Sequence, residues 1–209
     1  MTAFSVPTRD EVTPENQALF DNLKKALGFV PNLFATFAHS PTALGTYLTL
    51  QNAKSSLRPR EREVINLAVS QVNTCDYCLA AHTALAKMLG LTEVQIAEIR
   101  RGGASFDAKL DALARFARAV AEHRGHVSAE TTDAFLAAGW TQADLVDAII
   151  IVGDKTISNY LHGVTKVPVD FPAAESAAGR LFSPAVQTTA IASFWPDSDL
   201  VCQAVLSMG

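Results

Sequence analysis

The sequence lacks the features of an extended, disordered or nucleic-acid-binding chain. Its 209 residues include 11 glycines and 9 prolines, too few for a collagen-like or linker-dominated chain. Hydrophobic residues make up 49% and charged residues 18%, which excludes intrinsic disorder. The net charge is −4 and no basic cluster stands out, so we expect no nucleic-acid partner. The composition predicts a globular chain that can bury a core.

Long hydrophobic runs are also absent. The most apolar run, residues 148–153, lies between Asp147 and Asp154 and is far shorter than the roughly 20 residues that a membrane span needs. Residues 1–7 have neither the basic nor the apolar segment of a signal peptide. We therefore expect a cytoplasmic protein with no membrane partner.

Cysteine is scarce. Three cysteines, in a chain for which no export signal is expected, do not make a structural disulfide framework. Two of them, Cys75 and Cys78, form a Cys-x-x-Cys pair. The third, Cys202, lies alone in the C-terminal tail, and we interpret it as a bystander thiol.

Proline is missing between Pro59 and Pro168. Ala, Leu, Glu, Arg and Val dominate this stretch, and most apolar positions recur every three or four residues, which is typical of consecutive helices. Strand alternation is absent. The sequence predicts an all-α fold with helices near residues 14–27, 31–39, 41–56, 59–72, 75–89, 93–101, 106–124, 128–138 and 142–166.

Several of these helices have clear N-terminal signals. Pro14, Pro41 and Pro59 stand where a first helical residue is expected, the first two of them behind a good N-cap. Thr92 and Thr141 each begin a capping-box pattern.

An internal similarity indicates a repeat. Residues 89–99 resemble residues 138–148 at an offset of 49, and each segment follows a long helix and a shorter one. We expect two helical repeats, at about 41–101 and about 106–167.

The segment that contains the cysteine pair carries the candidate chemistry. On a helical wheel Cys75, Cys78 and His82 share an arc of about 80° with Leu85 and Leu89, so the thiols and the imidazole should face inward. A thiol in the first turn of a helix is favoured as thiolate. His82 lies one turn from Cys78 and can exchange a proton with it, and the two-residue spacing lets the sulfurs close a disulfide.

The second repeat does not carry these side chains. Arg124, Val127 and Thr131 stand at its equivalents of the two cysteines and His82. The chemistry would then belong to the first repeat alone.

Two other interpretations of the pair stay open on these grounds. The cysteines could be buried by chance, or they could bind zinc with His82 and a fourth ligand from Glu63, His162 or water. A thioredoxin fold is disfavoured because the segment before the pair is predicted to be helical. A carboxylate partner for His82 could be Glu61 or Glu63, and the helical period does not choose between them.

The spacing Glu63-x11-Cys75-x2-Cys78-x3-His82 resembles the alkylhydroperoxidase D-like branch of the carboxymuconolactone decarboxylase family. Residues 28–34, 39–41 and 170–172 resemble the larger peroxidase-related members, so the similarity covers roughly residues 5–172.

The resemblance implies an all-α fold of two repeats, an oligomer, and thiol-dependent peroxidase activity without metal or haem. It implies that Cys75 and Cys78 are the redox pair and that Glu63 and His82 form the proton relay. The chain departs from some members in having Tyr77 where they carry a second histidine.

We therefore expect an alkylhydroperoxidase D-like domain over residues 1–172, with an extension of unknown role at 173–209. The expected activity is reduction of hydrogen peroxide or organic hydroperoxides in antioxidant defence, without a cofactor. A dithiol or a thiol protein would reduce the disulfide again after each turnover. We expect the protein to be a homo-oligomer, that is, a dimer, a trimer or a hexamer. Cys78 would be the nucleophile, and Cys75, nearer the solvent-exposed helix start, would form the disulfide. The alternatives are a carboxymuconolactone-type lactone decarboxylase and a non-catalytic redox-sensing module.

Overall fold

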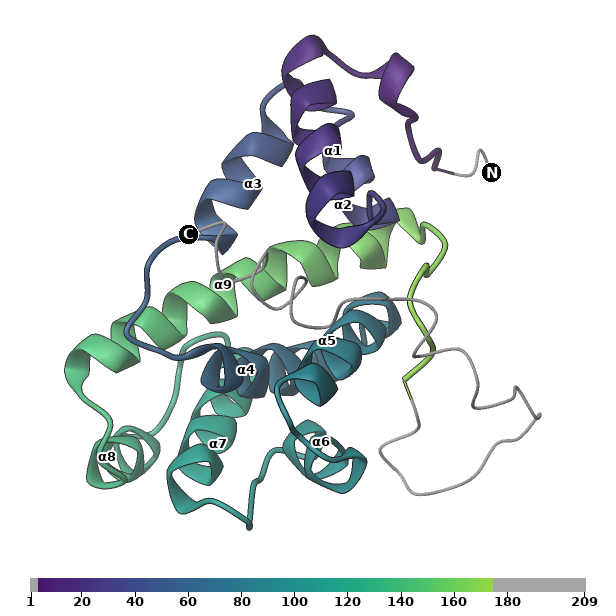
Figure 1. Cartoon of the computed structure of the whole chain (residues 1–209). Helices are drawn as coiled ribbons and strands as arrows, with labels where there is room; N and C mark the ends of the chain where they lie inside the picture. Colours follow the sequence, from purple (N-terminus) through teal and green to yellow (C-terminus); the bar gives the residue numbers. More distant parts are fainter. Residues whose placement is uncertain (1–3, 175–209) are drawn as a thin grey trace. The chain divides into compact units, whose positions relative to one another are not determined.

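The secondary structure is helical throughout the described part of the chain. The computed structural model describes residues 4–174, which form nine α-helices and one short 3-10 helix and contain no strand (Figure 1). The predicted all-α fold is confirmed. Each of the nine predicted helices has an observed counterpart, and the ends differ by a few residues.

The chain divides into two compact units, and the first comprises the described residues up to Ala53. It contains the 3-10 helix Arg9–Glu11 and the helices α1 (Pro14–Leu27), α2 (Asn32–Phe37) and α3 (Ala43–Gln51). These elements enclose a small apolar core made of Val12, Phe20, Leu23, Ala35, Ala38 and Leu44.

Capping explains where the helices of this unit begin. Thr13 accepts a hydrogen bond from the backbone N–H of Asn16, and Pro14 is the first residue of α1, as predicted. The helix predicted from Pro41 instead begins at Ala43. The hydroxyl of Ser40 accepts from the N–H groups of Thr42 and Ala43, but Thr42 is the N-cap residue of α3, and its side chain makes no capping hydrogen bond.

The second unit begins at Lys54 and carries the cysteine pair. Its helices are α4 (Pro59–Val72), α5 (Asp76–Met88), α6 (Glu93–Arg100), α7 (Ala108–Glu122), α8 (Ala129–Ala137) and α9 (Gln142–Thr165). Helix α4 is central, because it contacts α5, α6, α7 and α9. The long helix α9 runs along one side of α4 and α5 (Figure 1).

Apolar burial around α4 holds this unit together. Val64, Ile65, Leu67 and Val69 are almost completely buried although they point in different directions around the helix. Each such side chain contributes roughly 1.5–3 kcal/mol when fully buried. A cluster of aromatic rings from α7, α8 and the turn before α9 completes the core, and its members are Phe116, Phe135 and Trp140.

The helix bounds recur at the offset of the predicted repeat. Helices α4 and α7 begin at residues 59 and 108, and α6 and α9 begin at 93 and 142, a difference of 49 in both cases. Gly90 and Gly139 precede α6 and α9 with positive φ angles of 82° and 88°, which glycine adopts without strain. The two-repeat organisation stays a prediction with which these bounds agree.

Over the described residues, no helix by itself combines the length and the apolar character needed to cross a membrane. The pair α8 and α9 meets both criteria only together, and it is bent by 118°.

Candidate active site

A strained turn brings the cysteine pair from the end of α4 to the start of α5. Thr74 has a φ of 50°, a left-handed conformation that costs a residue with a side chain about 1 kcal/mol. The N–H of Thr74 donates to the carbonyl of Gln71, and the N–H of Cys75 donates to the carbonyl of Ser70. These two bonds form a Schellman motif, with threonine in the position that glycine usually takes. The turn places Cys75 directly in front of α5.

Cys75 is the N-cap of α5, and Cys78 lies in the first turn. The sulfur of Cys75 accepts a hydrogen bond from the N–H of Cys78 at 3.4 Å. Both cysteines are free thiols, and their exposed fractions are 2% and 3%. The expectation that Cys75 is nearer to solvent is therefore wrong. As an N-cap its side chain turns back over the helix end, where His162 of α9 covers it.

Glu63 and His82 form a buried pair between α4 and α5. Glu63 Oε2 lies 2.8 Å from His82 Nδ1, and each side chain is 9% exposed. The amide of Asn66 donates to the other carboxylate oxygen at 2.9 Å. Since a carboxylate only accepts hydrogen bonds, Nδ1 of His82 carries the hydrogen, and Nε2 is left to accept or give a reacting proton.

Glu63 is held as a carboxylate. Burial alone raises the pKa of Glu63, but the charge and hydrogen bond of His82, the Asn66 amide and the charge of Lys155 together lower this pKa below its ordinary value. A buried carboxylate of this kind is a fixed negative charge that orients the imidazole.

The structure distinguishes Glu63 from Glu61, which the helical period did not. Glu61 is also buried, but its carboxylate accepts from the backbone N–H of Arg58 at 2.7 Å and from the Arg58 guanidinium at 2.6 Å. This is the capping box of α4. Glu61 thus closes a helix end, whereas Glu63 contacts His82.

Helix α9 supplies polar groups on the other side of the sulfurs. His162 Nδ1 lies 3.7 Å from Cys75 Sγ, and Ser158 Oγ lies 3.8 Å from Cys78 Sγ. Lys155, which is 2% exposed, lies close enough for its charge to act on both sulfurs and on Glu63. All three side chains lie on one helical face, because they are three, four or seven residues apart.

The two thiols differ in acidity. A hydrogen bond from the Cys75 thiol, helped by the charges of Lys155 and His82 and by Ser158, lowers the pKa of Cys78 to about 5 although burial opposes it. The pKa of Cys75 is raised by its hydrogen bond to Cys78, by burial and by the charge of the Cys78 thiolate. These shifts favour a thiolate at Cys78 and a thiol at Cys75.

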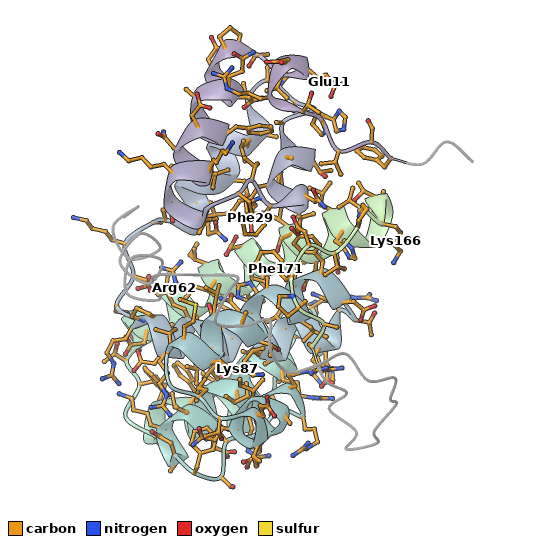
Figure 2. The ribbon with its side chains drawn as sticks, turned by 45° about the vertical axis from the view of Figure 1, so that its right-hand side comes forward. Glu11, Phe29, Arg62, Lys87, Lys166 and Phe171 are labelled. Carbon is orange, nitrogen blue, oxygen red and sulfur yellow. The ribbon has the colours of Figure 1, made fainter. Side chains whose placement is uncertain are left out.

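Tyr77 contacts both the segment after α9 and His162, and so links that segment to the site around Cys75 and Cys78. Its hydroxyl donates to Asp170 at 2.6 Å, and its ring lies 5.3 Å from the ring of His162. Phe171, which Figure 2 labels, packs edge-on against the same tyrosine, and the two ring centroids are 5.6 Å apart. Asp170 and Phe171, from the segment singled out in the sequence, thus contact Tyr77 on α5.

Sequence reasoning named Cys75, Cys78, His82 and Glu63, and the structure brings these four side chains into one corner. It did not identify Lys155 or Ser158, and it named His162 only as a possible fourth ligand of zinc. One signal was available in α9. The face that carries apolar residues at 148, 151 and 152 continues as polar residues at 155, 158, 159 and 162, all of them buried.

The sequence also left a zinc site open. Over residues 4–174, His, Cys, Asp and Glu side chains do not gather in any group of three or more that could hold a metal ion. Cys202 lies outside the described residues.

The all-α fold and the buried Cys75–Cys78 pair together define the class of this protein as an all-α protein with a buried dithiol. Residues 35–123 match the model of the carboxymuconolactone decarboxylase family. This stretch contains all four residues of the predicted motif and ends before α8. No curated protein sequence matches the chain.

Solved structures with the same fold confirm the resemblance. An uncharacterized peroxidase-related protein from Silicibacter sp. TM1040 is 25% identical over 80% of this chain and 91% of that one, with a TM-score of 0.70. An alkylhydroperoxidase AhpD core protein, also peroxidase-related and uncharacterized, from Ralstonia eutropha JMP134 is 24% identical over 77% and 88%, with a TM-score of 0.70.

The debrominase Bmp8, solved with 2,3,4-tribromopyrrole, shares the fold at 15% identity over 81% of this chain and 92% of its own, with a TM-score of 0.69. The structural neighbours therefore include an enzyme that acts on a substrate other than a peroxide.

Proposed function

We propose that this protein is a thiol-dependent peroxidase that reduces hydrogen peroxide or organic hydroperoxides with the Cys75–Cys78 pair. One observation carries the proposal. The sulfurs of Cys75 and Cys78 are buried together at the start of α5, near the hydrogen-bonded Glu63–His82 pair, and this environment lowers the pKa of Cys78 and raises that of Cys75. A low-pKa thiolate with a second thiol three residues away is suited to two-electron reduction and to disulfide formation.

In the first step, the Cys78 thiolate attacks one oxygen of the peroxide. An S–O bond forms, the O–O bond breaks, and Cys78 becomes a sulfenic acid while the peroxide is reduced to an alcohol or water. The proton that Cys78 loses on forming its thiolate moves to Nε2 of His82, which Glu63 orients, and His82 then gives it to the departing oxygen. Positioned acid–base help of this kind contributes about 10²- to 10⁴-fold.

In the second step, Cys75 attacks the sulfur of the sulfenic acid. An S–S bond forms, the S–O bond breaks, and the hydroxyl leaves as water. Two of the three causes that raise the pKa of Cys75 are its hydrogen bond to the Cys78 thiolate and the charge of that thiolate. Both disappear when Cys78 is oxidised, so Cys75 gains acidity only after Cys78 has reacted.

A dithiol or a thiol protein then reduces the disulfide and restores both cysteines. Because both sulfurs are almost fully buried, a small dithiol reaches them more easily than a protein surface does. A protein reductant would require local opening of the Cys75 turn.

Peroxide consumption with dithiothreitol tests the proposal, in a Cys202→Ser background so that only the site thiols are counted. We expect turnover in this parent protein, loss of turnover in Cys78→Ser, and a single turnover in Cys75→Ser with a dimedone-reactive sulfenic acid on Cys78. If the label appears only on Cys75 of the Cys78→Ser protein, the two roles are reversed.

The same assay separates the other functions. One equivalent of peroxide that leaves the free-thiol count unchanged would contradict the peroxidase and favour lactone decarboxylation. Disulfide formation without turnover would favour a redox-sensing module. A parallel reaction with 2,3,4-tribromopyrrole, the compound bound to the debrominase, asks whether the dithiol reduces that substrate instead.

Assembly into a homo-oligomer in the cytoplasm remains a prediction. It is supported by a row of exposed apolar side chains along α9, namely Val146, Ile149, Ile150, Ile157, Tyr160 and Val164. Light scattering at micromolar concentration should give at least twice the mass of one chain, and a monomer would contradict the prediction.

A further inference from the structure

His162 is buried at the end of α9 with both ring nitrogens engaged. Its exposed fraction is 7%, and its Nδ1 lies 3.7 Å from Cys75 Sγ. Its Nε2 lies 3.2 Å from the carbonyl oxygen of Val167. The proposed first step does not use this histidine, so its contact with the second thiol calls for a role of its own.

The carbonyl contact determines the tautomer of the ring. A backbone carbonyl can only accept, so Nε2 must carry the hydrogen, and Nδ1 of the neutral ring presents its lone pair to Cys75. The chain turn after α9 provides this carbonyl. Helix α9 ends at Thr165, and Lys166 adopts a left-handed φ of 52°, which reverses the chain so that Val167 faces back toward His162 (Figure 2 labels Lys166).

Neighbouring groups hold the ring in place. Val167 is 2% exposed, and the ring of Tyr77 lies against the imidazole. A basic nitrogen is therefore oriented toward one sulfur of the pair in a site from which water is largely excluded. This is the arrangement expected of a general base, not of a histidine that only fills space.

We propose that His162 is the base that accepts the proton of Cys75 when Cys75 forms the disulfide. The inference rests on the proposed function for its physiological setting. The Cys75 S–H bond breaks, its proton moves to Nδ1 of His162, and the sulfur electron pair forms the S–S bond to Cys78. The hydroxyl of the sulfenic acid leaves with that proton as water, so His162 returns to its neutral form.

The two histidines thus serve different sulfurs. His82 is bound through Nδ1 to Glu63 and serves the attack of Cys78 on peroxide, whereas His162 serves the attack of Cys75 on Cys78. The charged or titratable groups that act on Cys75 besides His162 are the Cys78 sulfur and Lys155. Tyr77 is the titratable neighbour on the other side of His162.

A single-turnover experiment separates the two steps. In His162→Gln the glutamine amide can still donate to the Val167 carbonyl but cannot accept a proton, so the local fold should be kept. With one equivalent of hydrogen peroxide, we expect peroxide loss within about twofold of the parent, disulfide formation at least about tenfold slower, and accumulation of sulfenic acid on Cys78 by dimedone labelling. His126→Gln, which changes an exposed histidine, should match the parent in both steps.

A second measurement reads the same step without peroxide. Dithiodipyridine reacts with Cys78, releases one pyridinethione and leaves a mixed disulfide, which Cys75 then attacks to release a second pyridinethione. We expect His162→Gln to slow only the second release, by at least about tenfold, and its rate to rise about tenfold per pH unit as hydroxide replaces the missing base. A merely structural role would not produce this pH slope.

The outcomes distinguish this inference from the proposed function. If the parent does not consume peroxide but His162→Gln still slows the second release, the peroxidase proposal fails and the role of His162 stands. If both proteins release the second pyridinethione at rates within twofold of each other, or if both releases slow equally, the role of His162 is overturned.

Discussion

The two sides of the dithiol are built in different ways. On the α4–α5 side, Glu63 and His82 form one hydrogen-bonded pair, which delivers a proton in the proposed mechanism. On the α9 side, Lys155 and His162 act separately, one as a charge and the other through a contact with the sulfur of Cys75. The Glu63–His82 pair therefore comes from two helices adjacent in sequence, whereas the low pKa of Cys78 also depends on α9, about 80 residues further along the chain.

The α9 side also supplies a positive charge, that of Lys155, near the negative charges of the α4–α5 side. Glu63 and the Cys78 thiolate are two negative charges in a buried corner, and an unpaired buried charge is strongly destabilising. Lys155 lies within electrostatic reach of both. Removing a charge on one side should therefore change the electrostatic environment of the groups on the other side. The following substitutions test this coupling.

Loss of the relay should have the largest effect. Glu63→Gln and His82→Ala should each slow peroxide consumption by about 10²- to 10⁴-fold, because the departing oxygen loses its proton donor. Steady-state assays with dithiothreitol measure this, and circular dichroism should show the helical fold unchanged. An effect below twofold in both variants would remove the relay from the mechanism.

Loss of the buried charge should have a smaller effect that depends on pH. Lys155→Met should raise the pKa of Cys78, so that at neutral pH a smaller fraction is thiolate and peroxide consumption falls by about 10- to 100-fold. The difference should shrink as the pH is raised. Lys87→Met makes the same change at a lysine that pairs with Glu93, and it should leave the rate within twofold. A Lys155→Met defect of equal size at all pH values would show that its charge is not what matters.

The Glu63 pair should contribute to acid sensitivity. The pKa of Glu63 is lower in the folded protein than its ordinary value of 4.5, so its contribution to stability is present above that value and is lost as the pH falls through the lower, folded pKa. Between pH 6 and about 3 the urea midpoint of the parent should fall more steeply than that of Glu63→Gln. Parallel curves would contradict the assigned charge state. Both proteins contain Cys78, so the comparison between them isolates the contribution of Glu63.

Glu61 should show the smallest effect on activity. Glu61→Gln weakens the capping box of α4 and should lower the free energy of unfolding by about 0.3–1.5 kcal/mol, while peroxide consumption stays within twofold. Urea unfolding and the steady-state assay measure the two quantities. A tenfold loss of activity would mean that the two carboxylates are not separable as the geometry indicates.

The helices could be predicted because their signals are local. Thr13, Thr92 and Thr141 cap helices within three residues of themselves, and each of these helices begins where the sequence places it. The helix predicted from Pro41 begins two residues later, because residues 41 and 42 form a turn and Thr42 is the N-cap of α3. The motif of two cysteines and His82 is local in the same sense, since it lies on one helix.

The rest of the site depends on packing that the local sequence does not encode. The helical period could not separate Glu63 from Glu61, because only the position of α5 decides which carboxylate meets His82. The burial of Cys75 follows from its cap conformation and from His162, a residue 87 positions away. Lys155 was missed because one buried lysine in an apolar helix has no short-range signal, and only its contacts across the fold give it a role.

The most direct test of the account is the acidity of each thiol. Iodoacetamide alkylation of the Cys202→Ser protein, followed across pH by peptide mass spectrometry, gives separate rates for Cys75 and Cys78. The account predicts that Cys78 alkylation rises with a midpoint near pH 5 and then levels off, while Cys75 is alkylated only above its ordinary pKa of 9.0. A common midpoint near 9.0, or an acidic Cys75 beside an ordinary Cys78, would contradict it.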